Sequence, residues 1–428
     1  MAEGTSKLHR GWAVVVACCL IMMFPCGFSF NAASVYYPYV AEALTGGNTA
    51  PVGLYMSIIY ITMAVCLLFM GKVFAEKNAS VVLSVSVAAI ALGFVLMATA
   101  TSIKMFYVAA ILLGFGNSTV LYLMIPVLIG RWFKVHNGLL IGIGTAFSGV
   151  AGMLWSPVAT SIILNHGYQA GYWMYAILSA IVGLFCTLVL IRTSPESCGV
   201  EPYGADQVKD TDNKPAVLEG VTVKTALSQP GTLILIALYA GLVNLGLTMN
   251  YYLPTYVKSL EMYAATPEVA AAVGAALASA TMFGTLIGKV LLGFTNDKST
   301  PGSIIFGLLC GIIGLLLVLF GPSVNIVLAY VGGFLFGIFF ASSVTTTPQL
   351  ARKVFGGLNY SQIYSYITAV CALLAAFGST FWGVIYDTTG NFVTTFFVDI
   401  AFMALAFVLG FAGMKAGKSL PRETQDVK

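Results

Sequence analysis

Long apolar stretches alternate with short polar ones along the whole 428-residue chain. A bilayer core about 30 Å thick needs roughly 20 helical residues to cross it, at ~1.5 Å per residue. Each apolar stretch of about that length is therefore expected to form one membrane-spanning helix. The stretches cover residues 11–40, 51–70, 81–100, 105–130, 139–165, 171–191, 232–256, 267–294, 303–321, 325–349, 361–385 and 392–414.

A longer polar stretch, rich in proline, glycine and charge, separates the first six apolar stretches from the last six. Such a composition is typical of a linker. We therefore predict an all-α membrane protein with 12 transmembrane helices in two six-helix halves. The halves cover 1–191 and 232–414, the linker covers 192–231, and a tail covers 415–428.

The composition supports a membrane protein and excludes several functions. Hydrophobic residues make up 59% of the chain and charged residues 8%, whereas soluble domains carry about 25% charge. This excludes an ordinary cytosolic, secreted or nucleic-acid-binding protein. The eight cysteines and three histidines show no spacing that would predict a metal site. No phosphate loop or catalytic set is present, so we expect no enzyme and no cofactor.

Basic residues indicate the orientation in the membrane. With the amino terminus inside, only Lys104 and Lys258 of the 20 Lys and Arg residues fall outside, and only Lys289 falls within a helix. Cytoplasmic loops of membrane proteins carry such an excess. Both termini are therefore predicted to be cytoplasmic, in a multi-pass protein of the inner (plasma) membrane.

Two loops of the first half recur in the second half. Gly71 begins GKVFAEKN and Gly293 begins GFTNDKST, 222 residues later. Arg131 begins RWFKVHNG and Arg352 begins RKVFGGLN, 221 residues later. These matching offsets indicate duplicated halves, and transporters built from repeats bind substrate near the membrane midplane, between the repeats.

These loops resemble the signature of the major facilitator superfamily, which is Gly-x-x-x-Asp-Arg/Lys-x-Gly. The second copy has Gly293, Asp297 and Lys298, whereas the first copy has Ala75 in place of the acid. The resemblance implies that this loop, together with Arg131, holds one conformation of a transporter.

Three further stretches are similar to the monocarboxylate transporter and oxalate/formate antiporter branch of that superfamily. They are RGWAVVVAC, GRWFKVHNGLLIGIGTAFSGVAG and GVIYDTTGNF. The resemblance implies a secondary active or exchange transporter of small organic anions, most of all monocarboxylates, that works by alternating access. We expect a monomer with a small carboxylate substrate. An exporter of larger amphipathic compounds remains the alternative.

Lys289 is the main candidate for a substrate contact. It lies eight residues before Asp297, hence about 12 Å deeper along a helix and near the midplane. An ionisable side chain at that depth costs roughly 2.5–3.5 kcal/mol and usually lines a pathway. The branch has arginine at this position, paired with the substrate carboxylate. We predict Lys289 as the substrate countercharge, with a structural or snorkelling role as the alternative.

The resemblance adds four candidate contacts, namely Asn31, Tyr122, Phe340 and Tyr364. Hydrogen bonding between helices is the competing explanation for each. The branch also has an acid where this chain has Thr285, so a proton-coupling pair is missing. The other embedded charge, Asp399, is expected one to two turns from the outer end of its helix, where snorkelling or hydration is easy. We favour a structural role for it, with a proton relay as the alternative.

Overall fold

The computed structural model describes residues 9–46, 50–205 and 217–426. The first half contains α1 (Gly11–Ile21), a π-helical turn (Met22–Cys26), α2 (Gly27–Phe30), a 3₁₀ turn (Ala33–Tyr36), α3 (Tyr37–Thr45), α4 (Ala50–Glu76), α5 (Ala79–Ala98), α6 (Ile103–Asn117), a second π segment (Ser118–Met124), α7 (Ile125–Trp132), α8 (Asn137–Leu178) and two π turns (Ser179–Gly183 and Cys186–Leu190).

The linker and the second half complete the chain. They contain a 3₁₀ turn (Glu196–Cys198), β1 (Val217–Gly220), α10 (Val223–Ser228), α11 (Pro230–Leu247), a 3₁₀ turn (Thr248–Tyr252), α12 (Leu253–Ser259), a 3₁₀ turn (Glu261–Tyr263), α13 (Pro267–Lys298), α14 (Thr300–Phe320), a 3₁₀ turn (Gly321–Ser323), α15 (Ile326–Phe355), α16 (Tyr360–Thr389), α17 (Phe392–Gly417) and β2 (Glu423–Asp426).

Within the described residues, 11 helical stretches are long and apolar enough to cross a membrane. One of them, Asn137–Leu190, has 54 residues, more than twice the roughly 20 that one crossing needs. Gly167 interrupts it with φ 83° and ψ 163°, a conformation that only glycine adopts readily. This stretch therefore supplies two crossings, and the predicted all-α fold with 12 transmembrane helices is confirmed.

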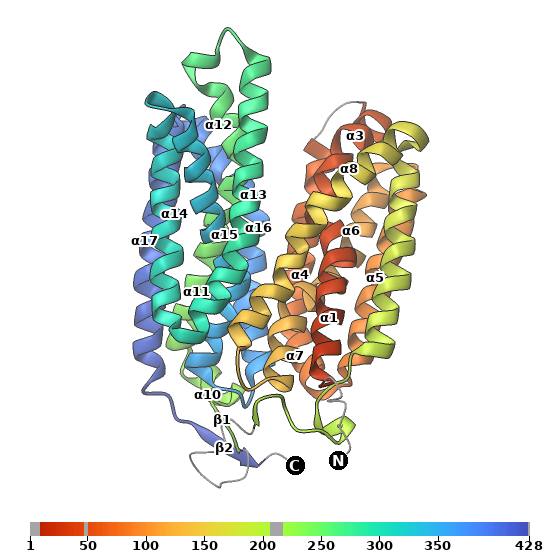
Figure 1. Ribbon diagram of the computed structural model, residues 1–428, viewed down its shortest axis with the longest axis vertical. Coiled ribbons are helices and arrows are strands. Elements are labelled where there is room, and N and C mark those ends of the chain that lie inside the picture. Colours follow the sequence, from red (N-terminus) through yellow and green to blue (C-terminus); the bar gives the residue numbers. More distant parts are fainter. Residues whose placement is uncertain (1–8, 47–49, 206–216, 427–428) are drawn as a thin grey trace, which may run out of the picture.

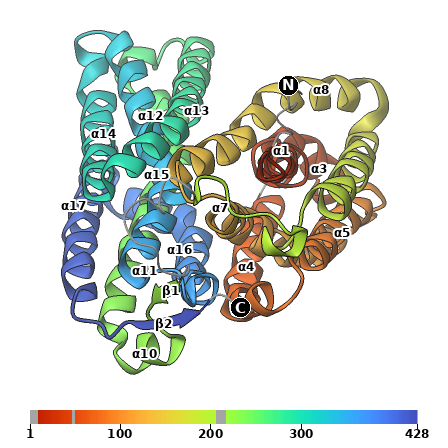
Figure 2. The ribbon, with the colours of Figure 1, turned by 60° about the horizontal axis from the view of Figure 1, so that its bottom comes forward.

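The helices form two bundles that contact each other mainly along two pairs of helices. Figure 2 separates the bundles, with α1 to α8 in red to yellow and α11 to α17 in green to blue. Contacts between the bundles join α4 to α16 and α8 to α13. The bundles diverge toward α3 and α12 and come together toward α10, β1 and β2 (Figure 1). We call the latter the β1–β2 end.

Small residues allow the helices to pack closely. A Cβ atom on Gly314 of α14 would lie 2.7 Å from the carbonyl oxygen of Gly332 in α15, and the reverse substitution would meet the Gly314 carbonyl at 2.6 Å. Between lipid-facing helices, such backbone contact replaces the hydrophobic effect as the source of association. Large apolar side chains such as Leu68 and Val85 instead remain exposed, as expected for surfaces that face lipid.

Prolines explain the irregular helix that carries the first candidate residue. Pro25 lies inside the π turn Met22–Cys26, and because proline has no N–H it disturbs the helical hydrogen bonds. The Pro25 carbonyl accepts a bond from the Ser29 hydroxyl at 2.8 Å, and the Asn117 amide donates to that hydroxyl at 3.0 Å. The bend that precedes Asn31 is thus fixed by side chains.

The linker is attached to both halves. Tyr203 exchanges backbone hydrogen bonds with Trp132 and Lys134 at 2.8 and 2.9 Å. Further on, β1 pairs antiparallel with β2, and the Val221 amide donates to the Phe355 carbonyl at 2.8 Å. The linker and the tail therefore form one small sheet on the second half.

Candidate substrate site and gates

Lys289 lies between the two halves. Its side chain is only 5% exposed, and its Nζ donates to the Thr145 carbonyl at 3.0 Å and to the Ser148 hydroxyl at 2.7 Å. Both partners belong to α8, whereas Lys289 belongs to α13. Among the described residues, no carboxylate forms a salt bridge with it. The ammonium is hydrogen-bonded, but its charge is not balanced.

Asn31 belongs to the same network. Its Nδ2 donates to the Ser148 carbonyl at 2.5 Å, so Ser148 contacts both Asn31 and Lys289. The Ser148 hydroxyl in turn donates to the Thr145 carbonyl at 2.9 Å. The network therefore links the first helix of the first half, through α8, to α13 of the second half.

Two tyrosines from opposite halves lie next to this network. Tyr122 and Tyr364 are 4% and 1% exposed, and they are close enough to interact electrostatically. Cys26 interacts in the same way with Tyr122 and with Lys289. Neither tyrosine hydroxyl has a hydrogen-bond partner in the part of the chain that the structure describes. Both hydroxyls are therefore available to a bound molecule.

Phe340 is not joined to this network by any described polar or ring contact. It is partly buried on α15 and packs against the hydrophobic core. The structure thus brings together four of the five predicted substrate residues and leaves Phe340 as an apolar neighbour on another helix.

The predicted gating loop of the second half, with Gly293, Asp297 and Lys298, lies where α13 contacts α8. Asp297 accepts from the backbone amides of Gly138 at 2.6 Å and Leu139 at 2.9 Å. It thereby caps the first turn of a helix in the opposite half, an arrangement worth about 1 kcal/mol. A Cβ on Gly293 would overlap Gly138, so this glycine permits the approach. The Nζ atom of Lys298 lies 4.4 Å from the centroid of the Phe294 ring, in a cation–π contact within α13.

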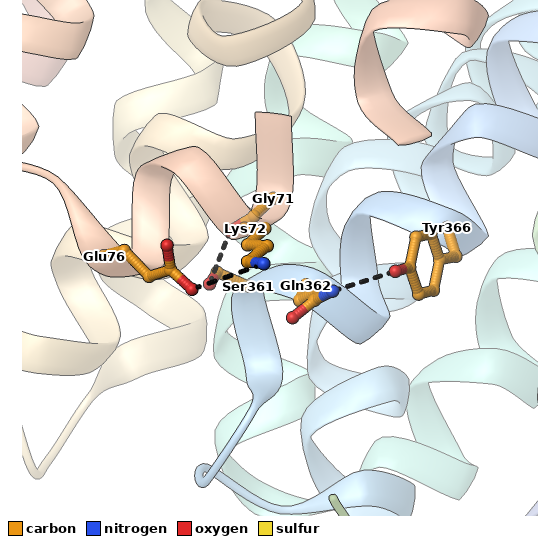
Figure 3. A network of polar contacts seen from close by, with 6 residues as sticks. All are labelled: Gly71, Lys72, Glu76, Ser361, Gln362 and Tyr366. Carbon is orange, nitrogen blue, oxygen red and sulfur yellow. Dashed lines mark hydrogen bonds and ion pairs between the residues drawn. The ribbon is translucent and has the colours of Figure 1, made fainter. Parts of the chain in front are cut away.

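The equivalent loop of the first half closes the α4–α16 contact by different bonds (Figure 3). The Ser361 hydroxyl donates to the Gly71 carbonyl at 3.1 Å. Lys72 and Glu76 form an exposed ion pair within α4 at 3.8 Å, and Gln362 donates to the Tyr366 hydroxyl at 2.9 Å. No carboxylate caps α16 in this network, as the missing acid of the first copy predicts.

The two repeated arginines have different partners. Arg131 donates to the carbonyl of Phe74 in its own half and to that of Thr193 at the start of the linker, both at 3.3 Å. Arg352 crosses to the first half, where it donates to Pro126 and Gly130 at 3.3 and 3.4 Å. Arg352 is therefore the member of the pair that holds the halves together.

Positive charge from both halves is crowded at the β1–β2 end. Burial lowers the pKa of Lys134, the Arg352 guanidinium lowers it further, and Glu196 opposes these effects. Lys134 lies in the loop between α7 and α8, beside the contact that Arg352 makes. Separation of the halves would relieve this repulsion.

Asp399 is fully buried. Its residue exposure is 0%, and neither carboxyl oxygen has a hydrogen-bond partner among the described residues. It faces Gly246 of α11, where a Cβ atom would lie 2.8 Å from Oδ1. The expectation that Asp399 reaches water near the outer end of its helix is therefore wrong, because packing by α11 covers it.

Sequence reasoning missed three polar residues of the site. Thr145 and Ser148 lie three residues apart on a glycine-rich helix, a spacing that places both on one face. That spacing was the available signal. Arg352 was recognised only as the repeat of Arg131, and the sequence held no sign that its partners lie in the other half.

Comparisons with known proteins agree with the architecture. The profile of the Major Facilitator Superfamily matches residues 19–356. The fold is similar to FucP, a transporter of that superfamily in the outward conformation, with 15% identity, a TM-score of 0.66, and coverage of 93% of this chain and 98% of that chain. A variant of the E. coli fucose:proton symporter FucP gives 14% identity, a TM-score of 0.66, and coverage of 95% and 99%. Among curated protein sequences, none matches.

Proposed function

The chain belongs to the Major Facilitator Superfamily of transporters, and from that premise we propose that it carries small monocarboxylates across the membrane, with Lys289 as their countercharge. The observation behind this proposal is the unbalanced ammonium between the halves. A buried charge without a counter-ion is costly, and an anion that binds beside it lowers that cost. A neutral substrate such as a sugar would not lower that cost.

A single carboxylate suits the residues around Lys289. Lysine presents one compact charge rather than the planar fork of arginine, so it matches a monoanion better than a dicarboxylate. The free hydroxyls of Tyr122 and Tyr364 and the amide of Asn31 can donate hydrogen bonds to the rest of the ligand. Phe340 would face its apolar part.

Alternating access follows from the two contacts between the halves. Both Asp297 and Arg352 tie the halves together at the β1–β2 end. We propose that this end is closed here and that substrate reaches Lys289 from the opposite end. Release then requires these contacts and the Ser361–Gly71 bond to break, while the halves rotate about the site.

The test compares Lys289→Gln with Lys289→Arg in proteoliposomes. Loss of a charge-assisted hydrogen bond costs about 1.5–3 kcal/mol, so Lys289→Gln should lower the affinity for lactate or formate roughly tenfold to a hundredfold. Lys289→Arg should keep part of the activity and shift preference toward oxalate. Uptake of labelled substrate and ligand-induced thermal stabilisation measure these effects.

Ser148→Ala provides the matched control. It removes one hydrogen bond of Lys289 but keeps the charge, so carboxylate transport should fall much less than in Lys289→Gln. A folded Lys289→Gln protein with wild-type carboxylate affinity would contradict the proposal. Transport of a neutral sugar or a large amphipathic compound by both proteins would favour the exporter or a sugar carrier instead.

We also propose that the β1–β2 end faces the cytoplasm, since it carries most of the basic residues. A Cys198→Ser background suits the test, because the other seven cysteines are buried. A cysteine at Lys224 should react with an impermeant reagent only from the cytoplasmic side. A cysteine at Lys104 should react only from outside, and the reverse pattern would disprove this orientation.

A further inference from the structure

A basic pocket lies at the β1–β2 end of the second half, away from the substrate site. It has a volume of about 470 Å³ and lies between the first turn of α14 and the last turns of α15 and α17. Among the residues that the structure describes, four cationic side chains line it, namely Lys353, Lys415, Lys418 and Arg422, and no acidic one does. The pocket therefore presents a concentration of positive charge.

The charge of the pocket is mostly unbalanced. Arg422 pairs with Glu219 at 3.6 Å, whereas the three lysines have no salt bridge within the described residues. All three lysines are exposed, so they can turn toward a ligand. Pro301, at the start of α14, adds the positive end of a helix dipole to the same pocket.

An apolar surface continues from the pocket into the membrane. Phe411 and Met414 of α17 line the pocket itself. Beyond them, Val408 of α17 is 59% exposed. On α14, Ile305 and Leu309 are 38% and 49% exposed and lie four and eight residues after Pro301, on the same helix face. The two helices contact each other along the outside of the second half (Figure 1).

We propose that this pocket binds the phosphate head group of an anionic phospholipid whose acyl chains lie along α14 and α17. Basic pockets at the end of transmembrane helices attract such head groups, with about 1 kcal/mol for each nearby Lys or Arg. The head group supplies the missing negative charge, and the exposed apolar side chains contact the chains. A soluble phosphate would use the charges but leave the apolar surface without a role.

The experiment measures lipid binding to the full-length protein in detergent by native mass spectrometry and thermal unfolding. Phosphatidylglycerol is compared with phosphatidylcholine of the same chains and with free glycerol phosphate. The wild type should bind phosphatidylglycerol and be stabilised by it, and should respond weakly to the other two. The variant Lys353→Gln/Lys415→Gln/Lys418→Gln should bind phosphatidylglycerol at least about tenfold more weakly.

The control variant Arg10→Gln/Lys72→Gln/Lys77→Gln removes three exposed charges from the same end of the other half. It should keep wild-type lipid binding. Equal losses in both variants would overturn the proposal, since they would show a general effect of net charge. Equal stabilisation by glycerol phosphate would overturn the lipid assignment, and equal affinity for phosphatidylcholine would exclude recognition of charge. Both variants must first show wild-type melting without lipid.

Discussion

Three ionisable side chains of the second half differ in the partners that their charges have. Lys289 has hydrogen-bond acceptors but no counter-ion, and Asp297 has two amide donors at a helix terminus. Asp399 has neither, because no described residue donates to its carboxyl oxygens. Since an unpaired buried charge is costly, we do not expect transport to depend on a carboxylate at position 399.

Asp399→Asn should therefore fold and transport near the wild-type rate, because the amide has the same shape as the acid. Uptake with trapped counter-substrate should also persist when only the pH gradient is removed. Asp297→Asn makes the same chemical change at a capping carboxylate and should alter transport. If a folded Asp399→Asn protein fails to transport, or if uptake requires the pH gradient, Asp399 carries a proton.

At the scale of helices, the contact between α8 and α13 depends on glycine. A Cβ on Gly142 would overlap the Lys289 carbonyl, whereas one on Gly149 would meet only Leu286, at an ordinary 3.8 Å. Overpacking typically costs 1–3 kcal/mol. Gly142→Ala should thus raise the population of molecules whose halves are separated at the β1–β2 end roughly tenfold. Gly149→Ala should leave that population unchanged.

Spin labels at Lys77 and Lys224, which are exposed on opposite halves, would report this shift as a longer distance distribution. The prediction is wrong if Gly142→Ala and Gly149→Ala give the same distribution as the parent protein. A general loss of folding would instead lower the melting temperature without producing a second, longer distance.

The helices were predictable from sequence to within a few residues, whereas their partners were not. Apolar runs of about 20 residues specify a membrane helix by length alone, so even the two crossings within Asn137–Leu190 were predicted separately. Contacts such as Lys289 with Ser148, or Arg352 with Gly130, depend on which faces meet across the halves. Residues 141 and 222 positions apart share no local pattern that could reveal this. Trp132 shows the same limit, since it is fully buried beneath the linker, where its Nε1 donates to the Arg192 carbonyl, 60 residues away in the chain.

At the scale of the whole molecule, the duplication identifies a missing bond. Asp297 caps Gly138 and Leu139, and the same offset of 222 residues places Ala75 opposite Tyr360 and Ser361 at the start of α16. By this correspondence, the first half lacks the acceptor of the capping contact.

Ala75→Asp should restore this contact, with about 1 kcal/mol of stabilisation from the new cap. We expect a higher melting temperature and slower transport, because the closed β1–β2 end becomes harder to open. Ala75→Leu, which adds bulk without an acceptor, should not raise the melting temperature. Unchanged melting and transport in Ala75→Asp would mean that the two contacts are not equivalent.

The attachment of the linker to both halves sets a limit on their movement. Tyr203 is bonded to the first half, and β1 is bonded to the second half through Val221 and Phe355. Eighteen peptide steps separate Tyr203 from Val221, and an extended chain advances at most about 3.6 Å per residue. The linker is thus a tether: however far the halves rotate, Tyr203 and Val221 cannot lie more than roughly 65 Å apart unless one of them detaches.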